Sequence, residues 1–241
     1  MSHKSPGDKI PGRFASPPCL ASEIAPDYFD PLGVDPQQAQ DVARWRSSER
    51  KRLRAERLNL SAEQRASAAQ AIAEYLDQLI ARRLGSPKGH VISGYWPIKA
   101  EPNLRSWMEI MISRGARMAL PVVDTPKTPL VFRAWDPETR MERGHWNIPV
   151  PSADAERLIP EVALAPLVGW DGAGYRLGYG GGYFDRTLAA LSPRPFVIGV
   201  GLQSSRIATI FPQPHDIRLN AIVTEAGIQW DERAQDCVPQ R

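Results

Sequence analysis

The stretch Gly169-Trp-Asp-Gly-Ala-Gly-Tyr-Arg-Leu-Gly-Tyr-Gly-Gly-Gly182 holds seven of the eighteen glycines of this chain. An apolar run at residues 162–168 precedes it, and residues 183–191 follow without glycine or proline. A strand, a glycine loop and a helix in this order form a phosphate cradle, because glycines expose backbone N–H groups and a helix begins with a partial positive charge. Arg176 and Arg186 also suit phosphate. The stretch therefore predicts an α/β domain that binds an anion, with a mobile surface turn as the alternative.

The spacing of these glycines differs from that of the two commonest phosphate loops. There is no G-x-x-x-x-G-K-[ST], and there is no G-x-G-x-x-G with an acidic residue about twenty positions further on. A P-loop NTPase and a simple dinucleotide-binding domain are therefore poorly supported.

Extended and helical segments alternate along the chain, which favours a largely parallel sheet with helices on both faces. The clearest helix begins at Ser61, because Ser61 and Gln64 have the spacing of a capping box, and it ends before Gly85. We expect strands at residues 90–96, 117–123, 130–135, 162–168, 196–201 and 221–224, and helices at 37–58, 61–84, 104–114 and 183–191.

The chain is expected to form one domain with two tails. Residues 1–36 hold seven prolines and few aliphatic side chains, so we expect an extended arm that is disordered or lies over the body. Residues 37–230 are expected to form a single domain, and residues 231–241 a C-terminal tail.

Composition excludes several classes of protein. The 241 residues are 42% hydrophobic and 24% charged, with a formal net charge of +3. No run approaches the roughly 18 consecutive apolar residues of a membrane span, and the N-terminus lacks the apolar stretch of a secretory signal, so we expect a cytoplasmic protein without a membrane partner. Cys19 and Cys237 are too few and too peripheral for a disulfide framework or a cysteine-based metal site.

Arginine outnumbers lysine by twenty-four to six, and seven basic residues lie between positions 44 and 57. At 100° per residue, Arg46, Arg50 and Arg57 fall within about 40° of one another on a helix. Three guanidinium groups on one face could converge on a polyphosphate. A solvated helix, or one that faces nucleic acid, is the alternative.

Four segments carry a resemblance to a known family. The run Arg176-Leu-Gly-Tyr-Gly-Gly-Gly-Tyr-Phe-Asp-Arg186 resembles the signature loop of the 5-formyltetrahydrofolate cyclo-ligases, also called methenyltetrahydrofolate synthetases. The basic helix from Arg46, the Tyr95-to-Glu101 segment and the His215-Asp216 pair resemble further parts of that family, so that the resemblance covers about residues 46–227. It implies a three-layer α/β/α fold with a mostly parallel sheet, like that of sugar-phosphate isomerases and CoA-transferases.

The resemblance implies cyclisation of 5-formyltetrahydrofolate to 5,10-methenyltetrahydrofolate, with ATP and magnesium as cofactors. ADP and phosphate would be released after a phosphorylated formyl intermediate. It also implies a small-molecule substrate, no nucleic-acid partner, and a monomer or weak dimer. Two alternatives stay open, namely an ATP-dependent enzyme of the same fold that acts on another formylated or heterocyclic substrate, and an arginine-rich protein that binds nucleic acid.

The same resemblance assigns roles to individual residues. Arg176 and Arg186 would be catalytic, Asp185 and Asp216 would hold magnesium, and Trp96, Glu101 and Tyr183 would bind the folate. The residues expected at ATP are Arg46, Arg50, Arg57, Arg176, Leu177, Gly178, Tyr179, Gly180, Gly181, Gly182, Tyr183 and Phe184.

The chain departs from the family pattern at several positions. Asn220 stands where a second Asp is usual, which weakens any ionic role there. Some members carry Lys where Gly181 stands, so the charge of phosphate must here be met by arginines, magnesium and backbone N–H groups.

Overall fold

A computed structural model of the chain describes residues 36–233. The expected arm, apart from Pro36, lies outside these residues, as do Cys19 and Cys237. The helices are α1 (Pro36–Leu58), α2 (Ala62–Leu84), α3 (Arg105–Ser113) and α4 (Tyr183–Ala190), with short 3-10 turns at His145–Asn147 and Gln203–Ser205. Within the described residues, no helix is long and apolar enough to cross a membrane.

An eight-stranded sheet forms the middle layer, in the order β12-β11-β10-β7-β1-β2-β3-β6. The five strands from β11 to β2 run parallel, and β12, β3 and β6 pair antiparallel at the two edges. The sheet strands are β1 (Val91–Ser93), β2 (Arg117–Val122), β3 (Val131–Ala134), β6 (Arg157–Leu158), β7 (Val162–Pro166), β10 (Phe196–Val200), β11 (Ala221–Thr224) and β12 (Gly227–Asp231). Two separate hairpins are β4 (Met141–Arg143) with β5 (Pro149–Pro151), and β8 (Gly169–Trp170) with β9 (Arg176–Leu177).

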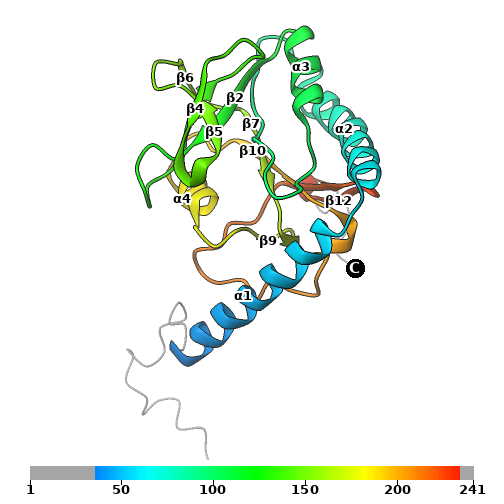
Figure 1. The fold of residues 1–241 in the computed structure, drawn as a ribbon, viewed down its shortest axis with the longest axis vertical. Coiled ribbons are helices and arrows are strands. Elements are labelled where there is room, and N and C mark those ends of the chain that lie inside the picture. The colour runs from blue at the N-terminus through cyan, green and yellow to red at the C-terminus, as the bar shows by residue number, and fades with distance from the viewer. Residues whose placement is uncertain (1–35, 234–241) are drawn as a thin grey trace, which may run out of the picture. The chain divides into compact units, whose positions relative to one another are not determined.

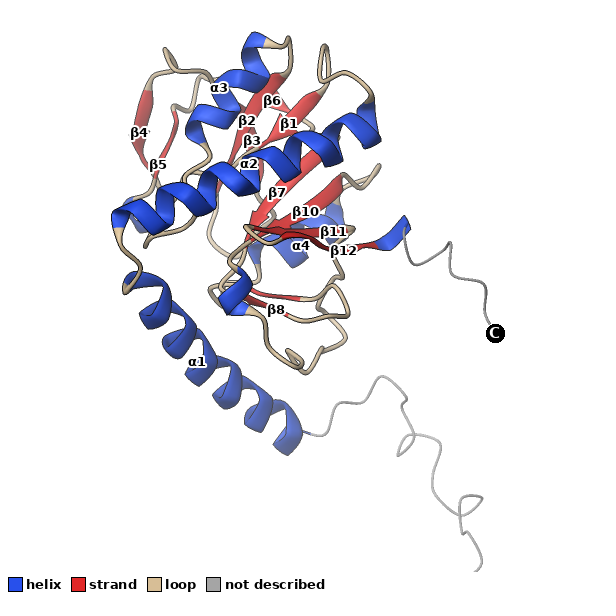
Figure 2. Ribbon diagram, turned by 90° about the vertical axis from the view of Figure 1, so that its right-hand side faces the viewer, coloured by secondary structure: helices blue, strands red, loops and turns tan. Residues whose placement is uncertain are grey.

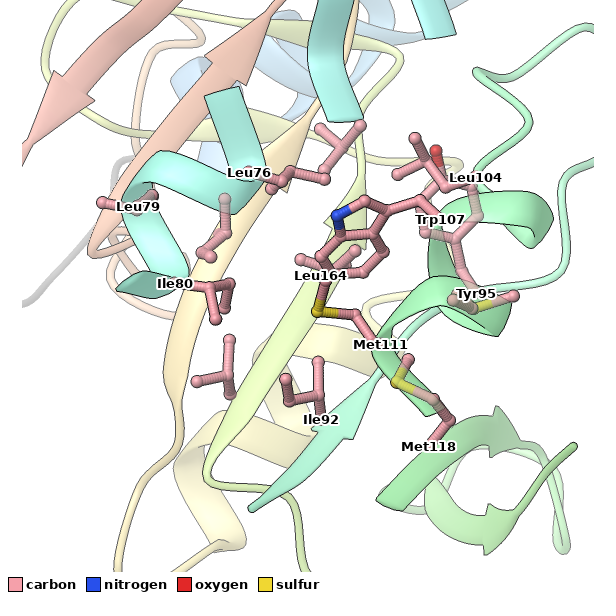
Figure 3. Packing of buried hydrophobic residues seen from close by; sticks show 14 of the residues in the cluster. Leu76, Leu79, Ile80, Ile92, Tyr95, Leu104, Trp107, Met111, Met118 and Leu164 are labelled. Carbon is pink, nitrogen blue, oxygen red and sulfur yellow. The ribbon is translucent and has the colours of Figure 1, made fainter. Parts of the chain in front are cut away.

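Helices cover both faces of the sheet, as Figures 1 and 2 show, with α2 and α3 on one face and α4 on the other. Leu76 and Leu79 of α2 pack with Trp107 of α3 over the strand residues Ile92 and Leu164 (Figure 3). A second core cluster lies under α4, around Leu188. Burial of apolar side chains on both faces explains why the central strands are apolar throughout rather than alternating.

The ends of α2 lie where the local signals placed them. The Ser61 hydroxyl accepts a hydrogen bond from the Gln64 backbone N–H at 3.1 Å, and the Gln64 side chain accepts one from the Ser61 N–H at 2.8 Å. Gly85 ends the helix at a φ of 72°, a conformation that costs a glycine little. An N-cap such as Ser61 stabilises a helix by about 1 kcal/mol.

The predicted fold class and all ten predicted elements are confirmed, with bounds that differ by a few residues. The edge strands β12 and β6 and the two hairpins were not predicted, because they are short and take their pairing from distant residues.

Candidate functional site

A cavity of about 720 Å³ opens at the carboxyl ends of the central strands, where ligands of open α/β sheets gather. Its walls come from α1, the β1–α3 loop, the end of β2, the β4–β5 hairpin and the glycine loop. Figure 2 shows α1 and the β8 hairpin beyond this same end of the sheet. Most of the predicted site residues meet on these walls, including Arg46, Arg50, Trp96, Glu101, Asp216 and every residue from Arg176 to Asp185.

The glycine loop leads directly into α4 at the cavity. Gly180 and Gly182 have φ values of 97° and 63°, which other residues adopt only with strain. A Cβ atom on Gly180 would come within 3.4 Å of the Arg50 guanidinium group. The Arg50 Nε donates to the Gly178 carbonyl at 2.7 Å, so the loop is held against α1 while its N–H groups and the start of α4 form an anion cradle.

Arg46 and Arg57, predicted to act together, occupy different environments. Arg46 lines the cavity and donates to the Asp216 carboxylate at 2.5 Å and to the carbonyls of Ile210 and Phe211 at 2.8 Å. Arg57 does not line the cavity, and its contact with a triphosphate stays a prediction. It is buried behind the loop, where it donates to the Tyr179 hydroxyl at 2.6 Å.

Arg57 also donates to the carbonyls of Lys99 and Leu167, both at 3.1 Å. The geometry thus makes Arg57 a support for the Tyr179 side chain. Arg186, predicted as catalytic, likewise lies outside the cavity lining and donates to the Gly181 carbonyl at 2.6 Å. Its catalytic role stays a prediction as well.

The outer face of α1 is neutralised by its own carboxylates. Arg52 pairs with Glu49 at 2.6 Å and with Glu56 at 2.7 Å, and Arg44 pairs with Asp41. The hydrogen bonds that Arg52 donates to Glu49 and Glu56 raise the pKa of Arg52. Arg44 and Arg52, two of the seven basic residues between positions 44 and 57, therefore form local surface pairs.

Two carboxylates that were predicted to hold magnesium face the same cavity. Asp185 accepts from Arg176 at 2.8 Å and from the Ile217 N–H at 3.3 Å. Burial acts to raise the pKa of Asp216, but the hydrogen bonds from Arg46 and the Gln213 N–H outweigh it and hold that pKa below its usual range. Burial lowers the pKa of Arg176, whose only side-chain hydrogen-bond partner between residues 36 and 233 is Asp185.

The donor set of this acidic pair fits magnesium. Within the described part of the chain, no group of three or more His, Cys, Asp or Glu side chains could hold a metal ion. Magnesium usually keeps several waters and takes one or two carboxylates together with substrate phosphates. Two carboxylates beside a phosphate cradle match that preference.

Glu101 also lines the cavity, and it is 5% exposed. Its two oxygens accept from the Ile98 N–H and the Tyr179 hydroxyl, both at 2.9 Å. Burial raises the pKa of Glu101. Trp96, beside it on the cavity wall, lies under the Arg105 guanidinium group at 5.1 Å. The cavity lining therefore includes an aromatic surface and a buried hydrogen-bond acceptor.

Sequence reasoning missed the β4–β5 turn, which brings Trp146 and His145 to the cavity. The Trp146 side chain is 59% exposed, and its ring lies 5.6 Å from that of Tyr183, edge to face. Trp146 and Asn147 have φ values of 56° and 60°, so the turn is strained where it faces the site. No local signal in the sequence indicates where this turn lies.

Asn220 lies away from the cavity wall. It accepts from the Val197 N–H at 2.7 Å and donates to Glu232 at 2.7 Å. The amide side chain can do both, whereas an aspartate could not donate. The asparagine at this position therefore links β10 to the residue that follows β12.

Comparisons with known proteins identify the family of this chain. The model of the 5-formyltetrahydrofolate cyclo-ligase family matches residues 42–225. Proteins named 5-formyltetrahydrofolate cyclo-ligase from Haemophilus influenzae and Mycolicibacterium smegmatis are 27% and 30% identical, over 70% and 56% of this chain and 92% and 74% of theirs. A solved 5,10-methenyltetrahydrofolate synthetase from Aquifex aeolicus superposes with a TM-score of 0.64 at 28% identity, covering 76% of this chain and 91% of that one.

Proposed function

This chain belongs to the 5-formyltetrahydrofolate cyclo-ligase family, and we therefore propose that it closes 5-formyltetrahydrofolate to 5,10-methenyltetrahydrofolate at the expense of ATP, with magnesium bound. The observation that carries the proposal is that two chemically different sets of residues line one cavity. Glycines and arginines suited to phosphate form one set, and Trp96, Tyr183 and Glu101, suited to a pteridine ring, form the other. An enzyme that joins these two substrates needs both sets in one space.

The reaction requires no nucleophile from the protein. The formyl oxygen attacks the γ-phosphorus of ATP, and ADP leaves with the electron pair of the broken phosphorus–oxygen bond. N10 then attacks the activated formyl carbon and loses its proton. The carbon–oxygen bond breaks, and inorganic phosphate carries away the former formyl oxygen.

The protein would then position the two substrates and compensate the negative charge of the phosphates. The N–H groups of the loop from Gly178 to Gly182 would hold phosphate oxygens, with Arg46 and Arg50 beside them. Arg176 and Arg186 would compensate charge at the loop and keep its shape. Asp185 and Asp216 would hold magnesium, which supplies charge neutralisation of the phosphates.

The aromatic residues of the cavity lining, together with Glu101, would bind the folate. Trp96, Tyr183 and the exposed Trp146 would contact the flat faces of the ring system. Glu101 would accept hydrogen bonds from ring N–H groups, because each of its oxygens has one protein donor and a further lone pair.

The direct test mixes purified protein with 5-formyltetrahydrofolate and magnesium-ATP, and follows the methenyl chromophore together with ADP release. We expect one ADP for each methenyl product and no product without ATP. ATP-independent turnover, or none, contradicts the proposal. The same assay with other formylated heterocycles separates it from an enzyme of the same family that has another substrate.

A further inference from the structure

Two cations on the cavity wall make no hydrogen bond or ion pair with the described residues. Five arginine and lysine side chains line the cavity, and three of them are held by Asp216, Asp185 or the Gly178 carbonyl. The remaining two are Arg54 and Lys99, whose side chains have no hydrogen bond or ion pair within residues 36–233. The Arg54 Nε is buried without an acceptor, and so are the Arg176 Nε on the same wall and the Arg133 Nε and Arg186 Nη1 outside the lining. It is therefore the place of Arg54 on the cavity wall that makes a bound ligand the candidate acceptor for its donors.

Arg54 and Lys99 come from different elements but lie against one ring. The Arg54 guanidinium carbon, on α1, is 5.7 Å from the centre of the Tyr179 ring, and the Lys99 ammonium, in the β1–α3 loop, is 5.5 Å from it. Arg54 follows Arg50 by one helical turn, so it continues the row of α1 side chains along the cavity.

Tyr179 connects a residue proposed to bind phosphate, Arg50, with one proposed to bind folate, Glu101. Its neighbours in the chain, Gly178 and Gly180, contact Arg50 on the phosphate side. Its hydroxyl donates to Glu101 on the folate side. The two cations are therefore located where a group passing from nucleotide to folate must lie.

We propose that Arg54 and Lys99 bind the phosphoryl group that is transferred, the γ-phosphate of ATP. This inference rests on the proposed function. During transfer, the oxygen–phosphorus bond to the formyl group forms while the bond to the β–γ bridging oxygen breaks, and charge spreads over the three remaining oxygens. Two cations that need not first break an ion pair can compensate that charge at no cost in lost protein contacts.

The folate carries a second anionic group, the carboxylates of its glutamate end, to which Arg54 and Lys99 could bind instead. The position of the two cations favours the γ-phosphate. The glutamate end lies at the far side of the folate molecule from the pteridine ring. Lys99 lies two residues from Glu101 in the chain and is close enough for its charge to lower the pKa of that carboxyl. Because Glu101 is the proposed partner of the pteridine ring, cations beside it are closer to the reacting formyl group than to the glutamate.

The test compares binding of two nucleotides by calorimetry, with magnesium present. Arg54→Gln and Lys99→Gln should each weaken binding of an ATP analogue with a β–γ imido bridge by about tenfold or more, and leave ADP affinity within about twofold. Arg54→Lys should recover part of the loss. Lys51→Gln, on the exposed side of α1, is the matched control and should bind both nucleotides like the wild type.

Equal losses for the imido analogue and ADP would overturn the inference, because the cations would then act on the inner phosphates. Unchanged nucleotide binding with a raised KM for folate would overturn it in favour of the glutamate carboxylates. A wild-type protein that binds neither nucleotide would instead overturn the proposed function. Thermal unfolding of Arg54→Gln should match the wild type, since Arg54 makes no hydrogen bond within the described chain.

Discussion

Tyr179 of the glycine loop donates its hydroxyl proton to Glu101 across 2.9 Å, although 78 residues separate them in the chain. The same hydroxyl accepts from Arg57 of α1 at 2.6 Å. A single phenol thus connects the loop that would hold ATP, the carboxylate that would hold folate, and the helix behind both.

Replacing Tyr179 by Phe should shift the pH dependence of folate use. The hydrogen bond from Tyr179 lowers the pKa of Glu101, so its loss raises that pKa further above the usual range. If the ionised carboxylate binds folate, the acidic limb of kcat/KM for folate moves to higher pH. The other groups that lower the pKa of Glu101, which are the Ile98 N–H, Arg57 and Lys99, are still present in this variant.

The measurement is a pH profile of kcat/KM for folate, with KM for ATP followed in parallel. Tyr75→Phe, on α2, is the control for loss of a tyrosine hydroxyl. A lower rate at every pH without movement of the acidic limb would mean that Tyr179 only supports the loop.

Asp185→Asn should raise the magnesium requirement. The amide keeps an acceptor for Arg176 but loses the charge that a divalent cation needs. We expect kcat to fall by about 100-fold or more and the midpoint of the magnesium titration to rise. Unfolding free energy should fall by about 1–2 kcal/mol, because the hydrogen bond to Arg176 loses its ionic character.

Glu109→Gln, an exposed carboxylate of α3, is the matched control for Asp185→Asn and should change neither quantity. Alanine at position 185 is a poorer probe, since it leaves the buried Arg176 without its carboxylate. A normal magnesium titration in Asp185→Asn would remove that carboxylate from the metal site.

Gly180→Ala should weaken ATP binding more than it destabilises the fold. Its φ of 97° costs an alanine about 1 kcal/mol or more, and the added Cβ would lie 3.4 Å from Arg50 in the cradle. We expect KM for ATP to rise about tenfold. Gly89→Ala is a close control, because Gly89 has a φ of 82° and open space around its Cβ.

If Gly89→Ala and Gly180→Ala lower the unfolding temperature alike and also raise KM for ATP alike, the glycine loop has no specific role in nucleotide binding. Thermal melts of both variants give the unfolding temperatures, and steady-state kinetics give KM for ATP.

Trp146→Ala should raise KM for folate by about tenfold with little change in stability, because the side chain is 59% exposed. Trp146→Phe should recover part of the affinity through the remaining ring contact with Tyr183. Ile159→Ala removes a side chain that is 66% exposed and should leave KM unchanged. An unchanged KM in Trp146→Ala would place the folate elsewhere in the cavity.

Local signals predicted the parts of this structure whose causes are local. The capping box of α2 and the strand, glycine loop and helix order of the site depend on neighbouring residues, and they were predicted correctly. The helical angle also grouped Arg46 and Arg50 correctly on the cavity side. It selected Arg57 rather than Arg54 as the third member, although Arg54 lines the cavity and Arg57 does not, since an angle gives the side of a helix and not the depth to which each turn is covered.

The parts that were missed depend on distant partners. Trp146 reaches the cavity because β5 pairs with β4 and because Arg133, on β3, donates to the Pro151 carbonyl at 3.0 Å. Nothing within a few residues of Trp146 contains that information. The edge strand β12 likewise takes its place from pairing with β11.

The hydrogen bonds from arginine to main-chain oxygen around the cavity suggest why this chain uses so little lysine. A guanidinium group has five N–H donors in a fixed plane, so Arg46 can hold two carbonyl oxygens and still pair with Asp216. Arg50 can hold Gly178 with one N–H and keep the others for a ligand. The protein thus fixes its positive charges in place when it folds, and a nucleotide that enters finds them already immobilised and loses little affinity to ordering them.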